Sequence, residues 1–202
     1  PMLKKHIMIS VLALLIAITG FSQDLKVGKT APDFSLTDPS GKTHRLQEYR
    51  GKYVVLEWVN YDCPFVKKHY NSGNMQALQT TYTGRDVIWL SINSSAPGKQ
   101  GNFTSKEILS RAKEYGAAFS AYLIDADGKV GKAYGARTTP HMFIIDPEGQ
   151  LVYAGGIDNI RSTDVDDVPR AKNFISQALD EALAGQPITD SISKAYGCSV
   201  KY

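Results

Sequence analysis

The sequence is poor in cysteine, and its two cysteines, Cys63 and Cys198, lie far apart in the chain. It therefore lacks the C-x-x-C pair that is typical of dithiol redox sites. It also lacks the closely spaced cysteine and histidine ligands of a zinc site, so we expect no metal and no other cofactor. Charge of one sign is not in large excess, with a formal net charge of +3 and no basic block. This balance argues against nucleic acid as a partner.

Long apolar runs are also missing, apart from one near the N-terminus. Ile7 to Ile18 form an apolar stretch of 12 residues after Lys4 and Lys5, which is too short for a spanning helix of about 20 residues. Small residues follow, and we predict a signal peptide over residues 1–22, cut near Ser22. An uncleaved, membrane-anchoring segment is the alternative. Export would place the protein in an oxidising compartment, where lone cysteines pair or cycle.

The remaining pattern alternates short apolar runs with helical segments. Strands are expected at 31–36, 42–46, 53–59, 86–94, 121–125, 141–146 and 150–155. Helices are expected at 63–82 with a kink at 71–74, from Thr104 to about Gly116, in a short turn at 129–135, and at 168–184. This order predicts an α/β fold with a central mixed sheet, helices on both faces and a short N-terminal strand extension. We expect one domain over 23–187 and a short, irregular tail over 188–202 that carries Cys198.

Cys63 lies where an apolar strand gives way to a helix, and this position favours a reactive thiol. The free N–H groups and the dipole of a helix N-terminus stabilise a thiolate. Pro64 suits the first helical turn, and Lys67 lies one turn further along the same face. Asp62 opposes the effect, since a nearby carboxylate raises a thiol pKa, and His69 is expected to point away. The alternative is a buried cysteine that acts as a small apolar residue.

Four stretches together resemble the thioredoxin superfamily: APDFSL with GKTHRLQEYRGKYVVLEWVN, then DCPFVKKHY, then AYGARTTPHMFIIDPEGQLVYAG, and the last helix. The chain is similar to secreted thiol-disulfide oxidoreductases and to peroxiredoxin-like proteins related to alkyl hydroperoxide reductase. The resemblance implies a thioredoxin-like fold in which Cys63 matches the first redox cysteine and Val66 stands in place of the second. It also implies that the Thr139–Pro140 bond is cis and faces Cys63.

The peroxiredoxin pattern is only partly kept. Asn60 stands where that family has a threonine, and Pro140 stands where it has an arginine. The residues expected to support Cys63 are therefore Asn60, Pro64, Lys67, Thr139 and Pro140.

Three functions remain open from the sequence. The first is thiol-disulfide exchange through Cys63, with protein or small-molecule thiols and disulfides as partners. The second is a thiol peroxidase in which Cys198 resolves the sulfenic acid that peroxide forms on Cys63. The third is a non-catalytic binding domain. Whether Cys198 is a resolving thiol, part of a structural disulfide or too distant to reach Cys63 stays open at this point.

Overall fold

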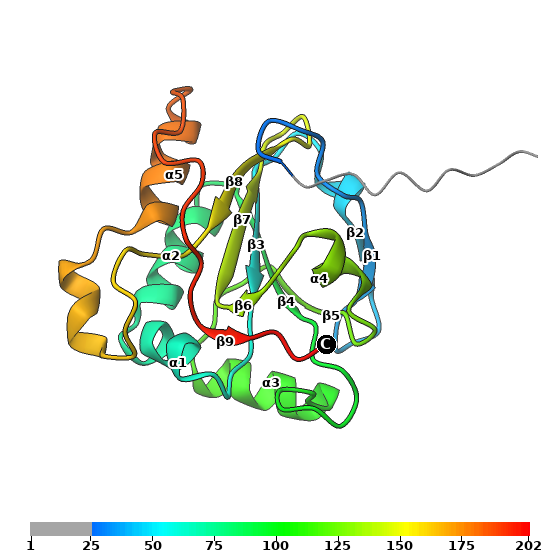
Figure 1. The fold of residues 1–202 in the computed structure, drawn as a ribbon. Helices are drawn as coiled ribbons and strands as arrows, with labels where there is room; N and C mark the ends of the chain where they lie inside the picture. Colours follow the sequence, from blue (N-terminus) through cyan, green and yellow to red (C-terminus); the bar gives the residue numbers. More distant parts are fainter. Residues whose placement is uncertain (1–25) are drawn as a thin grey trace, which may run out of the picture.

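A computed structural model describes residues 26–202 of the chain (Figure 1). The predicted signal peptide lies outside the described residues. Among residues 26–202, no helix combines the length and the apolar character needed to cross a membrane.

A seven-stranded mixed sheet forms the centre of the fold, in the order β2-β1-β5-β4-β3-β7-β8. Its strands are β1 (Ser35–Thr37), β2 (Thr43–Arg45), β3 (Val54–Trp58), β4 (Ile88–Asn93), β5 (Ala121–Ile124), β7 (His141–Ile145) and β8 (Leu151–Gly155). The three strands β3, β4 and β5 run parallel, whereas β7 is antiparallel to β3 and β8 is antiparallel to β7. All five residues of β3 are buried, because helices or loops cover both faces of the sheet there.

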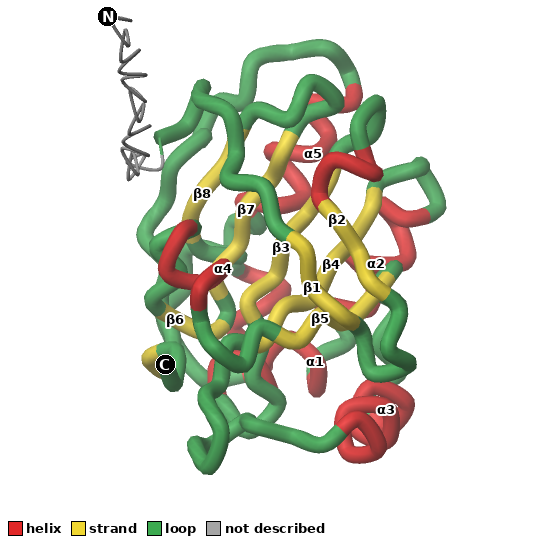
Figure 2. Tube along the Cα trace, turned by 90° about the vertical axis from the view of Figure 1, so that its right-hand side faces the viewer, coloured by secondary structure: helices red, strands yellow, loops and turns green. Residues whose placement is uncertain are grey.

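Helices cover the two faces of the sheet unequally. They are α1 (Pro64–Asn71), α2 (Asn74–Thr83), α3 (Ser105–Glu114), α4 (Lys129–Ala133) and α5 (Phe174–Leu183), with the 3₁₀ helices η1 (Leu46–Tyr49) and η2 (Val165–Arg170). Residues of α1, α2, α3 and α5 share one core with Val55 and Trp89 of the sheet. Tyr134, next to α4, and Leu46 of η1 share the other core with Trp58. Figure 2 shows α4 on the near side of the sheet, with α2 and α5 behind it.

The last helix begins later than the sequence predicts. Residues 168–184 were expected to be one helix, but η2 ends at Arg170 and α5 begins only at Phe174. Pro169 has no N–H for an α-helical bond. The side chain of Asn173 then accepts hydrogen bonds from the N–H groups of Ile175 and Ser176, and such a cap fixes a new helix start.

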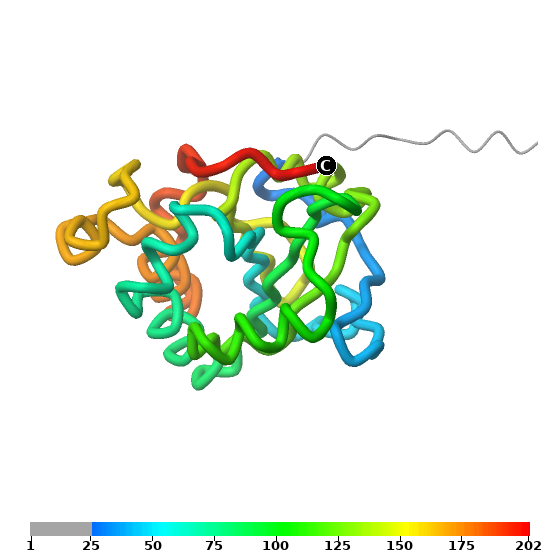
Figure 3. Tube along the Cα trace, turned by 90° about the horizontal axis from the view of Figure 1, so that it is seen from below, coloured from blue at the N-terminus to red at the C-terminus, as the bar shows by residue number. Residues whose placement is uncertain are grey.

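The C-terminal tail over 188–202 is mostly irregular, as predicted, but it contains one short strand that the sequence did not indicate. Its strand β9 (Cys198–Ser199) pairs antiparallel with β6 (Thr138–Thr139), and Cys198 lies opposite Thr139. Figures 1 and 3 show the tail running along one side of the molecule, across β6, to a C-terminus beside the loop after β4. A hydrogen bond from the N–H of Ala96 to the carbonyl of Lys201 fixes that end. The fold therefore carries Cys198 back across the sheet to the start of α1.

Candidate active site with two sulfur atoms

The turn between β3 and α1 positions Cys63. The buried Asn60 organises this turn, because its carbonyl accepts from the N–H of Cys63 at 3.0 Å and its side-chain oxygen accepts from the N–H of Asp62 at 2.9 Å. Cys63 is the N-cap residue of α1, and Pro64 occupies the first helical turn. Here Pro64 removes no hydrogen bond, since the first N–H groups of a helix have no partner within it.

The segment before β7 brings a second group to Cys63. The Thr139–Pro140 peptide bond is cis, as the sequence predicts. The Sγ atom of Cys63 lies 3.0 Å from the carbonyl oxygen of Thr139. Thr139 is 3% exposed, and its hydroxyl has no hydrogen-bond partner among the described residues. The structure therefore places Thr139 and Pro140 beside the cysteine.

The strand pair β6–β9 delivers the second sulfur to the same place. The Sγ atoms of Cys63 and Cys198 lie 2.7 Å apart, and both residues are free cysteines in this structure. Cys63 is fully buried, whereas Cys198 is partly exposed. Burial, followed by the hydrogen bond with Cys63 and repulsion from its sulfur, raises the pKa of Cys198 to about 11. Cys198 is consequently a protonated thiol at neutral pH while Cys63 is reduced.

The charged groups around the turn differ in how firmly they are held. Arg111 pairs with Asp62 at 2.9 Å, which offsets the negative charge that Asp62 brings near the thiol. Lys67 is partly exposed. The backbone N–H of Lys67 donates to the carbonyl of Cys63 at 2.9 Å. A role for the Lys67 charge in activating Cys63 therefore stays a prediction.

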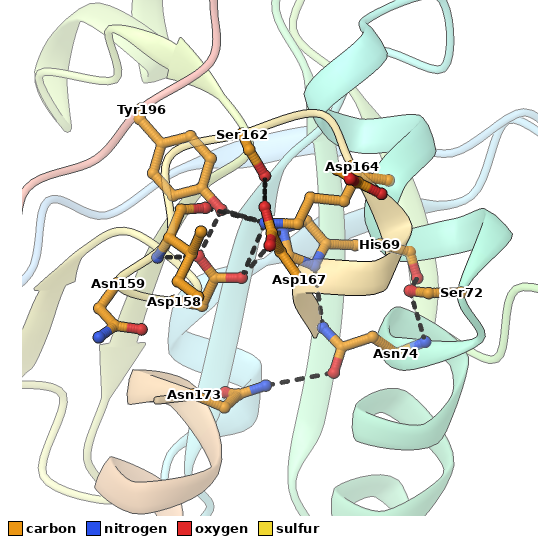
Figure 4. Close-up of polar contacts among 12 residues, drawn as sticks. His69, Ser72, Asn74, Asp158, Asn159, Ser162, Asp164, Asp167, Asn173 and Tyr196 are labelled. Carbon is orange, nitrogen blue, oxygen red and sulfur yellow. Dashed lines mark hydrogen bonds and ion pairs between the residues drawn. The ribbon is translucent and has the colours of Figure 1, made fainter. Parts of the chain in front are cut away.

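A buried polar cluster next to the site was not predicted from the sequence (Figure 4). Lys68, the residue after Lys67, is 1% exposed and its ammonium group lies 3.3 Å from Asp158. The hydroxyl of Tyr196 donates to Asp158 at 2.5 Å. Tyr196 lies two residues before Cys198, so the cluster joins α1 to the tail. The sequence did not indicate which of Lys67 and Lys68 would be buried, because helical periodicity cannot show where a tail distant in the sequence will pack.

The described residues offer little for a metal ion. Among residues 26–202, no group of three or more histidine, cysteine, aspartate or glutamate side chains is arranged to hold one.

A cysteine at the start of α1, opposite the residue before a cis proline on a mixed sheet, defines a thioredoxin-fold redoxin, and the protein is an oxidoreductase. The chain belongs to the AhpC/TSA family, whose sequence model matches residues 27–154. The match ends before the tail, so it does not include Cys198.

Relatives and solved structures agree with this assignment. The thiol-disulfide oxidoreductase ResA of Geobacillus thermodenitrificans is 31% identical over 150 residues, which are 70% of this chain and 80% of that protein. An uncharacterized conserved protein from Geobacillus kaustophilus has a crystal structure with a TM-score of 0.76 and 29% identity, covering 89% of this chain and 94% of that chain. The thioredoxin domain of a thiol-disulfide oxidoreductase from Bacteroides vulgatus shares the fold, with a TM-score of 0.52 and 19% identity over 73% of this chain and 97% of that domain.

Proposed function

We propose that the protein carries out thiol-disulfide exchange, with Cys63 as the nucleophile and Cys198 as the resolving thiol. The observation that carries the proposal is the 2.7 Å separation of the two sulfur atoms beside the carbonyl of Thr139. Exchange proceeds through a mixed disulfide, and it needs a second thiol within reach of the first. Cys198 supplies that thiol from the tail, in place of the second cysteine of a C-x-x-C motif.

The reduced protein would act on a substrate disulfide in two steps. The Cys63 thiolate attacks one substrate sulfur, forms a mixed disulfide and releases the other substrate sulfur as a thiolate. The Cys198 thiolate then attacks the Cys63 sulfur and releases the remaining substrate thiolate. Two electrons pass to the substrate, and the protein is left with a Cys63–Cys198 disulfide. With a substrate dithiol and the oxidised protein, the same steps run in reverse.

The order of the two steps follows from the electrostatics of Cys198. Its raised pKa keeps it protonated while Cys63 is free, so Cys198 does not compete as the first nucleophile. In the mixed disulfide the Cys63 sulfur carries no charge and is no longer a thiolate that accepts a hydrogen bond from the Cys198 thiol, so two of the three effects that raise the Cys198 pKa are removed. Cys198 then ionises more readily at the moment when its attack is required.

Access limits which substrates can react. Cys63 is 0% exposed, and strand β9 pairs with β6 and places the Cys198 sulfur against Cys63. A substrate disulfide must therefore displace β9 before it reaches Cys63, and it would meet the open edge of β6 when it does. An extended peptide segment or a small-molecule disulfide such as oxidised glutathione fits this opening.

Peroxide is the alternative oxidant, because the same sulfur pair could resolve a sulfenic acid on Cys63. Membership of the AhpC/TSA family favours this alternative. Asn60 and Pro140 weigh against it, since they replace the threonine and arginine that the peroxiredoxin resemblance would require. Consumption of hydrogen peroxide by the reduced protein, measured beside reduction of oxidised glutathione, distinguishes the two.

We also propose that the protein works after export, in a domain formed by residues 23–187 and completed by the tail 188–202. The support is the pattern of Lys4 and Lys5 followed by Ile7 to Ile18. Expression of the full chain, followed by N-terminal sequencing of the mature protein, tests the cut near Ser22. An intact N-terminus in the membrane fraction would favour the anchored alternative.

The exchange reaction itself is tested with oxidised glutathione as substrate. Mass spectrometry of the wild-type protein should find a Cys63–Cys198 disulfide and two equivalents of glutathione released per chain. If the protein stays fully reduced under excess oxidised glutathione, and also with an unfolded peptide disulfide, the proposal is wrong.

A further inference from the structure

We propose that Tyr196, held by Lys68 and Asp158, is a positioning residue that keeps Cys198 within reach of Cys63. The inference rests on the proposed exchange between these two cysteines. It gives a role to the buried ionic cluster of Lys68, Asp158 and Tyr196, which is separate from the two cysteines and from the loop of Pro140.

The three side chains form a closed hydrogen-bond network with no exposed charge. The side chains of Lys68 and Asp158 are 0% and 2% exposed, and Tyr196 is 4% exposed. The Lys68 ammonium donates to the Ile160 carbonyl at 2.8 Å and lies 3.3 Å from Asp158. The Tyr196 hydroxyl donates to Asp158 and lies 3.4 Å from the Lys68 ammonium. The opposite charges compensate one another, as buried charges must.

His69 completes the surroundings of the Tyr196 oxygen. The side-chain amide of Asn74 lies 3.0 Å from Nδ1 of His69, and its oxygen accepts from Asn173 at 3.3 Å. This arrangement assigns the proton of the neutral imidazole to Nε2, which lies 3.4 Å from the Tyr196 hydroxyl. The phenol oxygen thus has one acceptor and two donors around it, and its hydrogen-bonding capacity is filled.

Two short connections lead from this cluster to the two sulfur atoms. Lys68 follows Cys63 by five residues, so about 7.5 Å of helix axis separates the two along α1. Tyr196 precedes Cys198 by two residues, which span about 7 Å in extended backbone. The cluster therefore holds α1 and the tail together, at a similar distance from Cys63 and from Cys198. The ring of Phe65 packs edge-on against Tyr196 at 5.8 Å and supports the same contact.

Stability alone gives a weaker reason for this cluster. A buried ion pair adds little to folding compared with apolar residues of the same size, although it can select one arrangement of the chain. Here the selected arrangement is the path of the tail over β6. A tail without this attachment would still be joined to the fold by other contacts, but Cys198 would spend less time opposite Cys63.

The test measures the equilibrium between the Cys63–Cys198 disulfide and a glutathione redox buffer. The variant is Tyr196→Phe, which removes one hydroxyl and leaves the Lys68–Asp158 pair in place. The control is Tyr134→Phe, which removes another buried hydroxyl that donates to the Pro32 carbonyl at 2.6 Å. Tyr134 packs in the core on the other face of the sheet. Thermal unfolding of the reduced proteins reports the stability lost by each variant.

Tyr196→Phe should weaken formation of the disulfide by up to about tenfold, the limit set by losing one hydrogen bond to a charged group. Tyr134→Phe should change it less than about twofold at a comparable loss of stability. Equal effects of both variants, or no effect of Tyr196→Phe, would overturn the positioning role.

If Tyr196→Phe does not fold, Phe65→Leu is the second variant, because it loosens the packing against the Tyr196 ring. It should also weaken formation of the disulfide. An unchanged equilibrium would again overturn the positioning role. Absence of the disulfide in the wild type would contradict the exchange function instead.

Discussion

Cys198 is the strand partner of Thr139, the residue before the cis proline. The tail therefore occupies the backbone edge of Thr139. It also covers Cys63, which is fully buried. One segment of the chain thus supplies the second thiol and restricts access to the first, and the predictions below separate these two effects.

The first prediction concerns Gly197, where the tail approaches the proline loop most closely. Gly197 has φ +145°, and a Cβ atom there would overlap the carbonyl oxygen of Thr139. Gly197→Ala should displace β9 and speed alkylation of Cys63 by iodoacetamide. Backbone strain of about 1–3 kcal/mol should raise the population of molecules in which β9 no longer covers Cys63 by roughly 5- to 150-fold. The measurement is the alkylation rate at Cys63, followed by peptide mass spectrometry.

A matched control separates loss of the tail contact from general backbone strain. Gly185 has φ +70°, and no atom lies within 4 Å of the position that a Cβ atom would take there. Gly185→Ala introduces a side chain at positive φ without touching the proline loop. Its Cys63 should react at the wild-type rate. A similar acceleration in both variants would mean that β9 does not control access to Cys63.

The second prediction assigns separate steps to the two cysteines. Cys63→Ser should abolish reduction of oxidised glutathione, because no first nucleophile remains. Cys198→Ser should still complete the first step and accumulate a mixed disulfide between Cys63 and glutathione, which intact-mass spectrometry detects. If the adduct formed instead on Cys198 in the Cys63→Ser variant at a comparable rate, Cys198 would be the first nucleophile and the assigned roles would be reversed.

The third prediction follows from the cause of the Cys198 pKa. Burial raises it first, and the adjoining Cys63 sulfur raises it further, to about 11 from an ordinary value of 9.0. Cys63→Ser removes the sulfur contribution and keeps most of the burial. The pKa of Cys198 should then lie between these two values, as measured by thiolate absorbance against pH. An unchanged pKa would show that Cys63 does not influence Cys198, and the proposed order of steps would lose its electrostatic basis.

The sequence allowed the central fold to be predicted because its signals are local. The apolar run of β3, the capping box of Thr104 and Glu107, and the turn before β8 all depend on neighbouring residues. The predicted mixed sheet with helices on both faces agrees with the structure. Cys63 was placed at a helix start for the same reason, since strand and helix periodicities meet there.

The path of the tail could not be predicted, because it depends on contacts between residues that are far apart in the sequence. Tyr196 meets Asp158 and Lys68 across the fold, and Ser193 bonds to the hydroxyl of Tyr153 at 2.6 Å. Polar residues in a tail predict solvent exposure when they are considered alone. Here they find buried partners, so a mostly irregular segment follows a defined path and includes the short strand β9.

The last prediction is a loss of stability in mild acid that His69 causes. Burial first, with a smaller effect of Lys68, lowers the pKa of His69 to about 4, although Asp158 raises it. The unfolded chain binds a proton on this side chain below about pH 6.5, whereas the folded chain does so only near pH 4. Between these values the unfolded state binds more protons, so the free energy of unfolding falls as the pH falls. The loss should be on the order of 2–3 kcal/mol by about pH 4.5, in addition to the effect of other groups.

Urea unfolding of the wild type and of His69→Gln, at about pH 7 and about pH 5, measures this loss of stability. The glutamine keeps an amide donor and does not titrate, so the variant should lose less stability over this interval even if it starts from a lower value. Equal losses in the two proteins would mean that His69 is already protonated in the folded state at the lower pH, which would contradict the neutral imidazole beside Tyr196.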